Sequence, residues 1–417
     1  MARSGRRTLD GHIIIIGAGH AGVQAASSLR EEGFKGRLTL VSKDPELPYH
    51  KPPLSKAFLK AADAEPQILR AQAFYETNNI ELLRGVRATA IDPVARTLRF
   101  DDGNQVEWSK LLLATGAQPR RLSVPGSELK GIFYLRDCAD ARRLRDALAK
   151  AQNVVVIGGG FIGLEVAATA AMAGMSVTVI EAADRILGRA VSRSVAEHMH
   201  AYHESLGVRL MTNTGIERFD GERGHLTGVT TSSGHVLPAD LVLVGIGALP
   251  DTSLAQSAGL VCDNGVHVDV ACRTTAADIY AIGDCVSFPQ SGTGRRLRLE
   301  SVQNATDQAR VAAKSMLGKD ATYDAVPWFW SDQGERKLQM AGLSFNVDGE
   351  IMTGDPASGA FAVYLYSGER LVAVETVNRP GEHMMARRML AAGFSPPVAL
   401  VHEGLAALKA AMATAAR

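Results

Sequence analysis

The chain has 417 residues and a mass of 44.3 kDa, more than one hydrophobic core usually organises, which predicts two or three domains. Hydrophobic residues make up 46% of the sequence and charged residues 21%, a balance typical of a folded globular protein and not of a disordered or fibrous one. The formal net charge of +1 excludes a strong overall field that would draw the chain to nucleic acid or to a membrane.

The N-terminal elements predict a βαβ unit. The apolar run Ile13–Ile16 indicates a β-strand, and after a glycine turn the helical pattern of Ala21–Glu32 leads to a second strand at Leu38–Val41. The basic leader has no signal-peptide core, because the apolar run that follows it is short and meets glycines. No stretch approaches the ~20 apolar residues of a membrane span, so we expect a cytoplasmic protein.

A glycine fingerprint follows the first strand directly. Gly17, Gly19 and Gly22 have GxGxxG spacing. In a dinucleotide-binding fold the first glycine permits a tight turn, the second lets the backbone approach a pyrophosphate, and the third lets helix and strand pack closely. The helix N-terminus adds N–H groups and a favourable dipole for phosphates. This segment therefore predicts a dinucleotide site.

Two later strands end in residues suited to the same cofactor. Leu111–Thr115 indicates a buried strand followed by Gly116, and Ile279–Ile282 indicates another followed by Gly283 and Asp284. Each strand end allows a close approach of the backbone, and Asp284 offers an acceptor for a ribityl hydroxyl.

The same architecture returns in the middle of the chain. The order strand, glycine turn, helix and strand recurs at Val154–Ile157, at Gly158, Gly160 and Gly163, at Leu164–Ala173 and at Val177–Ile180. Two fingerprints in one chain indicate two dinucleotides, and hydride can pass directly between them if one is a flavin.

Glu181 ends the last of these strands, 23 positions after Gly158. A carboxylate there accepts hydrogen bonds from a ribose 2′-hydroxyl and repels a 2′-phosphate, which favours NADH over NADPH. Arg185 and Arg189 favour NADPH instead, because arginines just past the strand can hold a 2′-phosphate.

After Pro327 the pattern changes to shorter alternating segments at Phe361–Tyr366 and Leu371–Val377, and then to helical sequence from His383. We therefore expect an α/β fold with two Rossmann-like, glutathione-reductase-type dinucleotide-binding domains and a C-terminal α+β domain. The expected boundaries are 1–118 and 248–326 for a discontinuous FAD-binding domain, 119–247 for the NAD-binding domain, and 327–417 for a C-terminal interface domain.

Segments along almost the whole chain resemble the FAD-dependent NADH:ferredoxin reductases of the putidaredoxin reductase type. This family includes reductases of ring-hydroxylating dioxygenases and, more distantly, apoptosis-inducing factor. The segments are LPYHKPPLSK at 47–56, LLLATGAQPR at 111–120, FYLRD at 133–137, GGGFIGLEVAA at 158–168, LVGIGALP at 243–250, YAIGDC at 280–285, ESVQNA at 300–305, PWFWSDQ at 327–333 and VNRP at 377–380.

The resemblance implies tightly bound FAD, NADH as co-substrate, and a reaction in which hydride goes from nicotinamide C4 to flavin N5. Electrons would then leave singly to a 2Fe-2S ferredoxin, which serves a haem-thiolate monooxygenase or a ring-hydroxylating dioxygenase. NADH:ferredoxin reductase activity is thus the expected function.

The resemblance also implies roles for individual residues. Lys56 would lie at the isoalloxazine and pair with Glu165, one residue from each Rossmann domain. A lysine near flavin N5 stabilises the negative charge of reduced flavin, and the carboxylate keeps the lysine placed and cationic; the alternative is a purely structural ion pair. Trp330 would lie near the flavin edge, with Trp328 on the same side of an extended segment and core packing as the alternative. The other implied cofactor contacts are Ala21, Ala88, Arg120, Arg136, Ile162, Gly247, Glu300 and Val302.

The sequence departs from the family pattern at two positions. Lys43 stands where an acidic residue usually holds the adenosine ribose, so either the neighbouring Asp44 or the backbone takes that role. Lys51 stands where arginine is common, and its ammonium can meet a phosphate with less directional hold.

Arginines indicate where a partner protein could dock. The run Arg295–Glu300, with Arg310, Arg387 and Arg388, could form a basic face for an acidic ferredoxin or only a solvated surface. We expect a monomer or weak dimer without nucleic-acid or membrane partners.

Two rival functions remain open. A disulfide reductase or NADH peroxidase needs a cysteine beside the flavin, where this chain has PPLSK. Its cysteines lie outside that segment and lack CxxC spacing, so reduced thiols are expected at Cys138, Cys262, Cys272 and Cys285. The other rival is an NADH-sensing protein of the apoptosis-inducing-factor type, in which slow charge-transfer complexes replace turnover.

No metal site is expected. His198, His200 and His203 lie on an expected helix, but only His200 and His203 share a face, and zinc would need further ligands.

Overall fold

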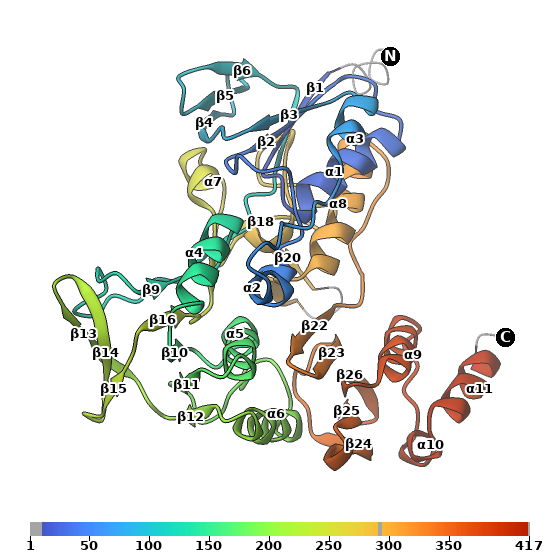
Figure 1. Cartoon of the computed structure of the whole chain (residues 1–417). Helices are drawn as coiled ribbons and strands as arrows, with labels where there is room; N and C mark the ends of the chain where they lie inside the picture. Colours follow the sequence, from blue (N-terminus) through green and yellow to red (C-terminus); the bar gives the residue numbers. More distant parts are fainter. Residues whose placement is uncertain (1–10, 291–293, 416–417) are drawn as a thin grey trace. The chain divides into compact units, whose positions relative to one another are not determined.

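The computed structural model describes residues 11–290 and 294–415 and divides the chain into two compact units (Figure 1). The first unit comprises the residues up to 51 with 66–118 and 248–325, and the second comprises 52–65, 119–247 and the residues from 326 on. Each unit is therefore built from three separate stretches of chain.

A parallel five-stranded sheet organises the first unit, in the order β19-β7-β1-β2-β3. Its strands are β1 (His12–Ile16), β2 (Arg37–Ser42), β3 (Ile80–Arg84), β7 (Lys110–Leu113) and β19 (Ile279–Ala281). Helices α1 (His20–Glu31) and α8 (Val302–Met316) pack on one face, against Ile13 and Ile15, while Ile14 faces the opposite side. Such runs, apolar on both faces, are typical of parallel strands covered on both sides.

Smaller elements complete the first unit. Two three-stranded sheets have the orders β4-β5-β6 and β18-β20-β21, and β8 pairs with β17 where the chain leaves and re-enters the unit. The strands are β4 (Ala88–Asp92), β5 (Thr97–Phe100), β6 (Gln105–Glu107), β8 (Ala117–Pro119), β17 (Ala248–Pro250), β18 (Val266–His267), β20 (Val286–Pro289) and β21 (Arg296–Leu297), and the short helices are α3 (Gln72–Thr77) and α7 (Ser253–Ser257).

The second unit repeats the parallel design, with the strand order β12-β11-β10-β16-β9. These strands are β9 (Ile132–Phe133), β10 (Asn153–Ile157), β11 (Ser176–Ile180), β12 (Arg209–Met211) and β16 (Leu241–Val244), with helices α4 (Cys138–Leu148), α5 (Phe161–Met172) and α6 (Arg193–Ser205). An antiparallel ribbon of β13 (Ile216–Glu222), β14 (His225–Thr231) and β15 (Val236–Pro238) is added to it. The two parallel sheets confirm the predicted pair of Rossmann-like folds.

The C-terminal part forms an antiparallel five-stranded sheet with helices, which confirms the predicted α+β tail. The strand order is β22-β23-β26-β25-β24. Its elements are β22 (Trp328–Gln333), β23 (Arg336–Gly342), β24 (Gly349–Asp355), β25 (Ala360–Ser367), β26 (Arg370–Val377), α9 (Pro380–Ala391), α10 (Val398–Glu403) and α11 (Leu405–Ala415).

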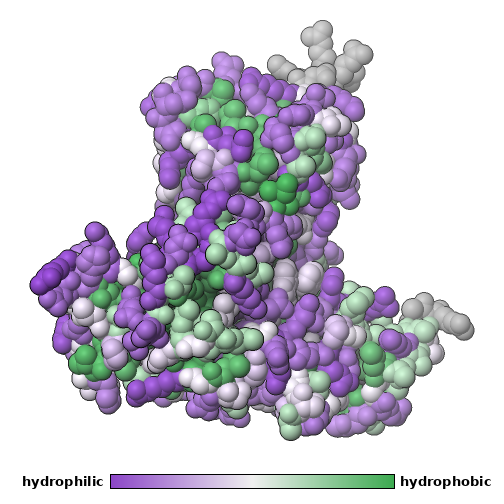
Figure 2. Space-filling model, viewed as in Figure 1, coloured by the Kyte–Doolittle hydropathy of each residue, from purple (hydrophilic) through white to green (hydrophobic). Residues whose placement is uncertain are grey.

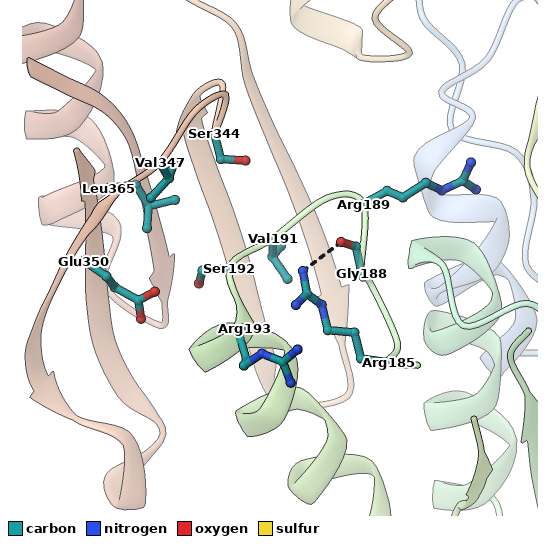
Figure 3. A pocket seen from close by; sticks show the side chains of 10 residues that line it. All are labelled: Arg185, Gly188, Arg189, Val191, Ser192, Arg193, Ser344, Val347, Glu350 and Leu365. Atoms are coloured by element: carbon teal, nitrogen blue, oxygen red, sulfur yellow. Dashed lines mark hydrogen bonds between the residues drawn. The ribbon is translucent and has the colours of Figure 1, made fainter. Parts of the chain in front are cut away.

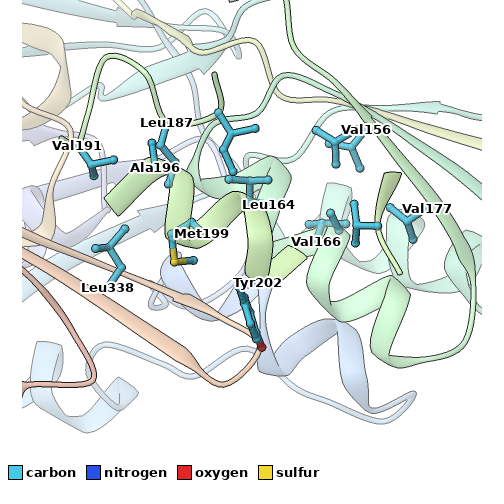
Figure 4. Close-up of a cluster of buried hydrophobic side chains, with 14 of the residues drawn as sticks. Val156, Leu164, Val166, Val177, Leu187, Val191, Ala196, Met199, Tyr202 and Leu338 are labelled. Atoms are coloured by element: carbon cyan, nitrogen blue, oxygen red, sulfur yellow. The ribbon is translucent and has the colours of Figure 1, made fainter. Parts of the chain in front are cut away.

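One hydrophobic core runs through the second Rossmann-like fold and the C-terminal sheet. Figure 4 shows Leu338 of β23 beside Met199 of α6, and both belong to the cluster that also contains Leu164 and Val156. The sequence predicted separate domains at 119–247 and 327–417, whereas these parts share apolar side chains and belong to one unit.

The segment of residues 52–65 also belongs to the second unit, although it was expected in the FAD-binding domain. It contains α2 (Ala57–Lys60), which packs against α4. Leu59 of α2 is buried in the core of the second unit. Burial of the Leu59 side chain stabilises the position of residues 52–65 in the second unit.

On the face drawn in Figure 2, hydrophilic residues cover most of the surface and hydrophobic residues occur in small groups. None of the helices in the described ranges combines the length and hydrophobicity that a membrane crossing needs.

Candidate cofactor sites and comparison with known proteins

The glycines of the first fingerprint have three different environments, and these match the three roles that the motif predicts. Gly17 has φ +109, and a Cβ there would lie 2.1 Å from the Ala114 carbonyl oxygen. A Cβ on Gly22 would lie 1.8 Å from the oxygen of Gly17, whereas a Cβ on Gly19 would meet nothing within 4 Å. Gly17 and Gly22 thus serve turn and packing, and Gly19 leaves open space where a pyrophosphate can approach.

The second fingerprint repeats this arrangement in the second unit. Gly158 has φ +103, and a Cβ on it or on Gly163 would lie 2.4 Å from a backbone oxygen. At Gly160 the nearest atom to an added Cβ is 4.0 Å away. Among the described residues no side chain caps the N-terminus of α1 or α5, so both helices offer backbone N–H groups to phosphates. The residues present therefore fit one dinucleotide in each unit.

The carboxylate of Glu181 is fixed beside the second fingerprint. Its Oε2 accepts a hydrogen bond from the N–H of Gly159 at 2.7 Å, and its Oε1 accepts one from the N–H of Ala183 at 2.8 Å. Each carboxylate oxygen can accept a further bond. The group is thus held by backbone while its remaining lone pairs can accept from a ribose hydroxyl.

The two arginines that could favour NADPH line a cavity of about 300 Å³ (Figure 3). Nη2 of Arg185 donates to the carbonyl of Gly188 at 2.9 Å, whereas the side chain of Arg189 extends away from that bond. The opposite wall comes from the C-terminal sheet and its loop, with Ser344 and Glu350. Arg185 is thus already engaged by its own loop.

The other strand ends of the first unit lie close to the first fingerprint. Gly116 has φ +74 and Gly283 has φ +80. A Cβ on Gly283 would lie 3.2 Å from the Cβ of Ala21, which places the segment before Asp284 against the start of α1. Thr115 donates from Oγ1 to the carbonyl of Asp251 at 2.7 Å and so ties its strand end to the re-entering chain.

The alternatives for the adenosine ribose lie in one loop. Lys43 is exposed. The Asp44 carboxylate accepts from the N–H of Glu46 at 3.1 Å and from the hydroxyl of Tyr49 at 2.7 Å, so both of its oxygens stabilise the loop itself. The Lys51 ammonium lies 5.1 Å from the centre of the Tyr49 ring.

Lys56 and Glu165 form a buried ion pair, as predicted, with 2.9 Å between Nζ and Oε2. Glu165 is 4% exposed and Lys56 17%. Both residues lie in the second unit, so the expectation that they belong to different Rossmann domains is wrong. The Glu165 carboxylate also accepts from the hydroxyls of Ser55 and, at 2.6 Å, of Ser331; no sequence pattern predicted a role for either serine.

The aromatic segment before Ser331 alternates as a strand requires. The rings of Trp328 and Trp330 lie 5.7 Å apart, which confirms that both point to one side of β22. Phe329 points to the other side and its ring lies 4.7 Å from that of Phe161 on α5. The guanidinium of Arg387 stacks 4.3 Å from the Trp328 ring.

The remaining predicted contacts are spread over both units. Ala88, Glu300 and Val302 lie in the first unit, and Arg120, Arg136, Ile162 and Gly247 in the second. Ile162 is 48% exposed on the first turn of α5, and Gly247 has φ +102 with no atom within 4 Å of an added Cβ. The Glu300 carboxylate pairs with Arg298.

The arginine-rich run is partly internal. Arg296 donates to the carbonyl of Val268 at 2.9 Å and to Ser287. The Arg298 side chain is only 14% exposed. Arg310, which is half exposed, pairs with Asp307 at 2.6 Å. Several of these arginines therefore stabilise their own loops.

The histidines and cysteines give no further reactive centre. Within the described ranges no group of three metal-ligating side chains is assembled, and His203 instead bonds Gln333. Cys138, Cys262, Cys272 and Cys285, all within the described residues, form no disulfide bond. Burial raises the pKa of the Cys285 thiol, which keeps it in the unreactive protonated form.

Two family models match consecutive stretches of the chain. A family model described as pyridine nucleotide-disulphide oxidoreductase matches residues 11–309, and one described as reductase C-terminal matches residues 328–412. The chain is 46% identical to rhodocoxin reductase of Rhodococcus erythropolis over 91% of this chain and 89% of the relative. It is 40% identical to putidaredoxin reductase CamA of Pseudomonas putida over 91% of each chain.

Solved structures give the same result. The covalent putidaredoxin reductase–putidaredoxin complex matches with a TM-score of 0.92 and 38% identity, over 97% of this chain and 99% of that chain. An NAD-dependent persulfide reductase from A. fulgidus matches with a TM-score of 0.83 at 23% identity and so shares the fold. The predicted FAD and pyridine nucleotide cofactors are those of this family. By sequence over nearly its whole length, the chain belongs to the pyridine nucleotide-disulphide oxidoreductase family and carries that family's reductase C-terminal domain.

Proposed function

We propose that the protein oxidises NADH and passes the electrons, through bound FAD, to a 2Fe-2S ferredoxin. The observation that carries the proposal is the pair of glycine fingerprints, one in each unit and each with the open space that a pyrophosphate needs. Relatives of 40% identity or more are named as rhodocoxin reductase and putidaredoxin reductase, which supports a ferredoxin as acceptor. A haem-thiolate monooxygenase or a ring-hydroxylating dioxygenase would use the reduced ferredoxin.

The chain's own residues supply binding and alignment. FAD, when bound, accepts two electrons from a nicotinamide and releases them one at a time. Gly17, Gly19 and the N-terminus of α1 would hold its pyrophosphate, and Asp284 a ribityl hydroxyl. Lys56, kept in place by Glu165, would provide positive charge for the reduced ring.

The coenzyme is proposed to be NADH. Gly158, Gly160 and the N-terminus of α5 would bind its pyrophosphate, and the anchored carboxylate of Glu181 its ribose hydroxyl. A 2′-phosphate would approach this fixed negative charge and be repelled. Arg185 gives less compensation, because one of its nitrogens already donates to Gly188.

The ferredoxin is proposed to be acidic and to meet exposed arginines. Arg310 is exposed and Arg387 is partly exposed over the Trp328 ring, and each is a separate candidate within its own unit, because Arg296 and Arg298 bond their own loops. Attraction between such charges increases the association rate and is screened over about 10 Å at 0.1 M salt. Electron transfer to the ferredoxin should therefore slow as salt increases.

Stopped-flow reduction with separated acceptors tests the proposal. The purified yellow protein should be bleached by NADH much faster than by NADPH, and cytochrome c reduction should depend on added 2Fe-2S ferredoxin. Rubredoxin is the matched alternative acceptor, because a rubredoxin-NAD(+) reductase of Pseudomonas putida is 42% identical. Faster reduction of rubredoxin, or a long-lived reduced complex that no acceptor discharges, would reject the ferredoxin assignment.

A further inference from the structure

A string of buried polar side chains leads away from Glu165 inside the second unit. The Ser331 hydroxyl lies 2.6 Å from Oε1 of Glu165, and Nε2 of Gln333 lies 3.2 Å from that hydroxyl. Oε1 of Gln333 lies 2.8 Å from Nε2 of His203 on α6. Ser331, Gln333 and His203 are each 0% exposed, so the string connects the ion pair to a histidine in the interior.

The strand period explains how β22 makes this string. Phe329, Ser331 and Gln333 are alternate residues and therefore share one side of the strand. Phe329 packs against Phe161 of α5, which places Ser331 against Glu165 on the same helix. Burying three polar groups is costly unless each is hydrogen-bonded, and here each of the three has a partner in the string.

The chemistry of the donors fixes the direction of every bond. Paired with Lys56, the Glu165 carboxylate can only accept, so the single hydroxyl proton of Ser331 must point to it. The Ser331 oxygen must then accept from the amide N–H of Gln333, and the amide oxygen of Gln333 must accept from His203. His203 therefore carries its proton on Nε2, and all three bonds donate toward the carboxylate.

The state of His203 agrees with this direction. Burial is the main cause that lowers the pKa of His203, and the nearby His200 lowers it further, while the hydrogen bond that His203 makes to Gln333 acts against them. Its Nδ1 has no hydrogen-bond partner among the described residues. A neutral ring with the proton on Nε2 satisfies Gln333 and leaves no buried N–H unpaired.

We propose that Ser331, Gln333 and His203 are positioning residues, which orient the Glu165 carboxylate and, through it, the ammonium of Lys56. This inference rests on the proposed role of Lys56 beside the flavin. Aligned hydrogen bonds polarise one another in a low dielectric, so loss of one member should loosen the carboxylate without removing any charge.

Substitutions in the holoenzyme test the role. Ser331→Ala and Gln333→Leu should slow flavin reduction by NADH about 3- to 10-fold, the order expected for the loss of one ordinary hydrogen bond. They should also shift the flavin potential in the same direction as Lys56→Met, but less. Ser331→Thr keeps a hydroxyl and should retain wild-type values. Thr376→Val is the matched control, because Thr376 is equally buried in the same sheet and its hydroxyl bonds a backbone carbonyl instead.

Nuclear magnetic resonance of the wild-type holoenzyme, with ¹⁵N-labelled histidine, tests the direction without any risk of misfolding. The His203 ring should show the Nε2–H tautomer, and its signals should not titrate between pH 6 and 8. An Nδ1–H tautomer would overturn the proposed direction. Folded Ser331→Ala protein with the potential and the reduction rate of the wild type would overturn the positioning role. The flavin potential and the rate of flavin reduction by NADH are both measured without an electron acceptor. They therefore remain decisive if ferredoxin proves to be the wrong partner.

Discussion

Glu375 of β26 provides a direct test of how the C-terminal sheet is joined to α6. The side chain is 2% exposed, and its carboxyl oxygens accept from the N–H of Ser192, at 2.9 and 3.0 Å, and from the Ser192 hydroxyl at 2.6 Å. Ser192 is the N-cap of α6. Burial raises the pKa of Glu375 to about 7 from the ordinary 4.5, although the bonds from Ser192 oppose this rise.

The pKa shift sets the sign and size of the effect. Between pH 4.5 and about 7 the folded state holds a proton on Glu375 that the unfolded state has lost, so stability falls as pH rises. At 1.36 kcal/mol per pKa unit the loss is roughly 3 kcal/mol, complete above pH 7. Glu375→Gln keeps the shape and can keep the bonds to Ser192 without a charge. This substitution should therefore increase the free energy of unfolding by up to about 3 kcal/mol at pH 8 and by almost nothing at pH 4.5.

Urea unfolding followed by tryptophan fluorescence measures this, because Trp328 and Trp330 lie in the same sheet as Glu375. Curves for wild type, Glu375→Gln and the exposed control Glu369→Gln should be compared at pH 5 and pH 8. The control should change little at either pH. A Glu375→Gln protein that is less stable than wild type at pH 8 would refute the reasoning, because the carboxylate would then be ionised and favourably held. A difference in the free energy of unfolding that is the same at both pH values would refute it as well.

Three further predictions concern the proposed reaction. Glu181→Ala should relax the preference for NADH by about tenfold or more, since it removes both an acceptor for the 2′-hydroxyl and the repulsion of a 2′-phosphate; unchanged ratios of the NADH and NADPH reduction rates would contradict this. Lys56→Met should make the flavin potential more negative and slow reduction, and adding Glu165→Ala should change little more, because members of a pair do not act additively; a wild-type potential would leave the pair a structural role only. Arg387→Glu should slow ferredoxin reduction at low salt and spare ferricyanide reduction, and equal ferredoxin rates at low and high salt would place docking elsewhere.

The sequence was sufficient for features that depend on local order along the chain. Both glycine fingerprints, the strands that precede them and Glu181 were predicted, because spacing alone specifies a turn between strand and helix. The side on which Trp328 and Trp330 lie followed from the period of a strand. The Lys56–Glu165 pair came from the family resemblance, since no local rule joins residues so far apart in sequence.

Features that depend on tertiary packing were missed. The assignment of residues 52–65 to the second unit depends on the burial of Leu59, and a short apolar segment does not indicate which core receives it. The family resemblance includes Ser331 and Gln333 only as letters of the segment PWFWSDQ, although the alternation that places the tryptophans on one face also sends these two side chains to the opposite face. Arg296 was expected to contribute charge to a docking face, but its guanidinium bonds the carbonyl of Val268. The composition of the sequence does not reveal such a bond.

The interleaved course of the chain has a consequence for how the protein is made. The polypeptide passes from one unit to the other after residues 51, 65, 118, 247 and 325. During synthesis the first unit cannot gain β19 until about residue 281, or α8 until about residue 316, has left the ribosome. The second waits still longer for its C-terminal sheet. Domains that are contiguous in sequence can fold one after another as they emerge, but here both must be completed late and almost together. Nascent chains stalled before residue 279 should therefore stay sensitive to protease throughout the first unit, since its sheet still lacks an edge strand.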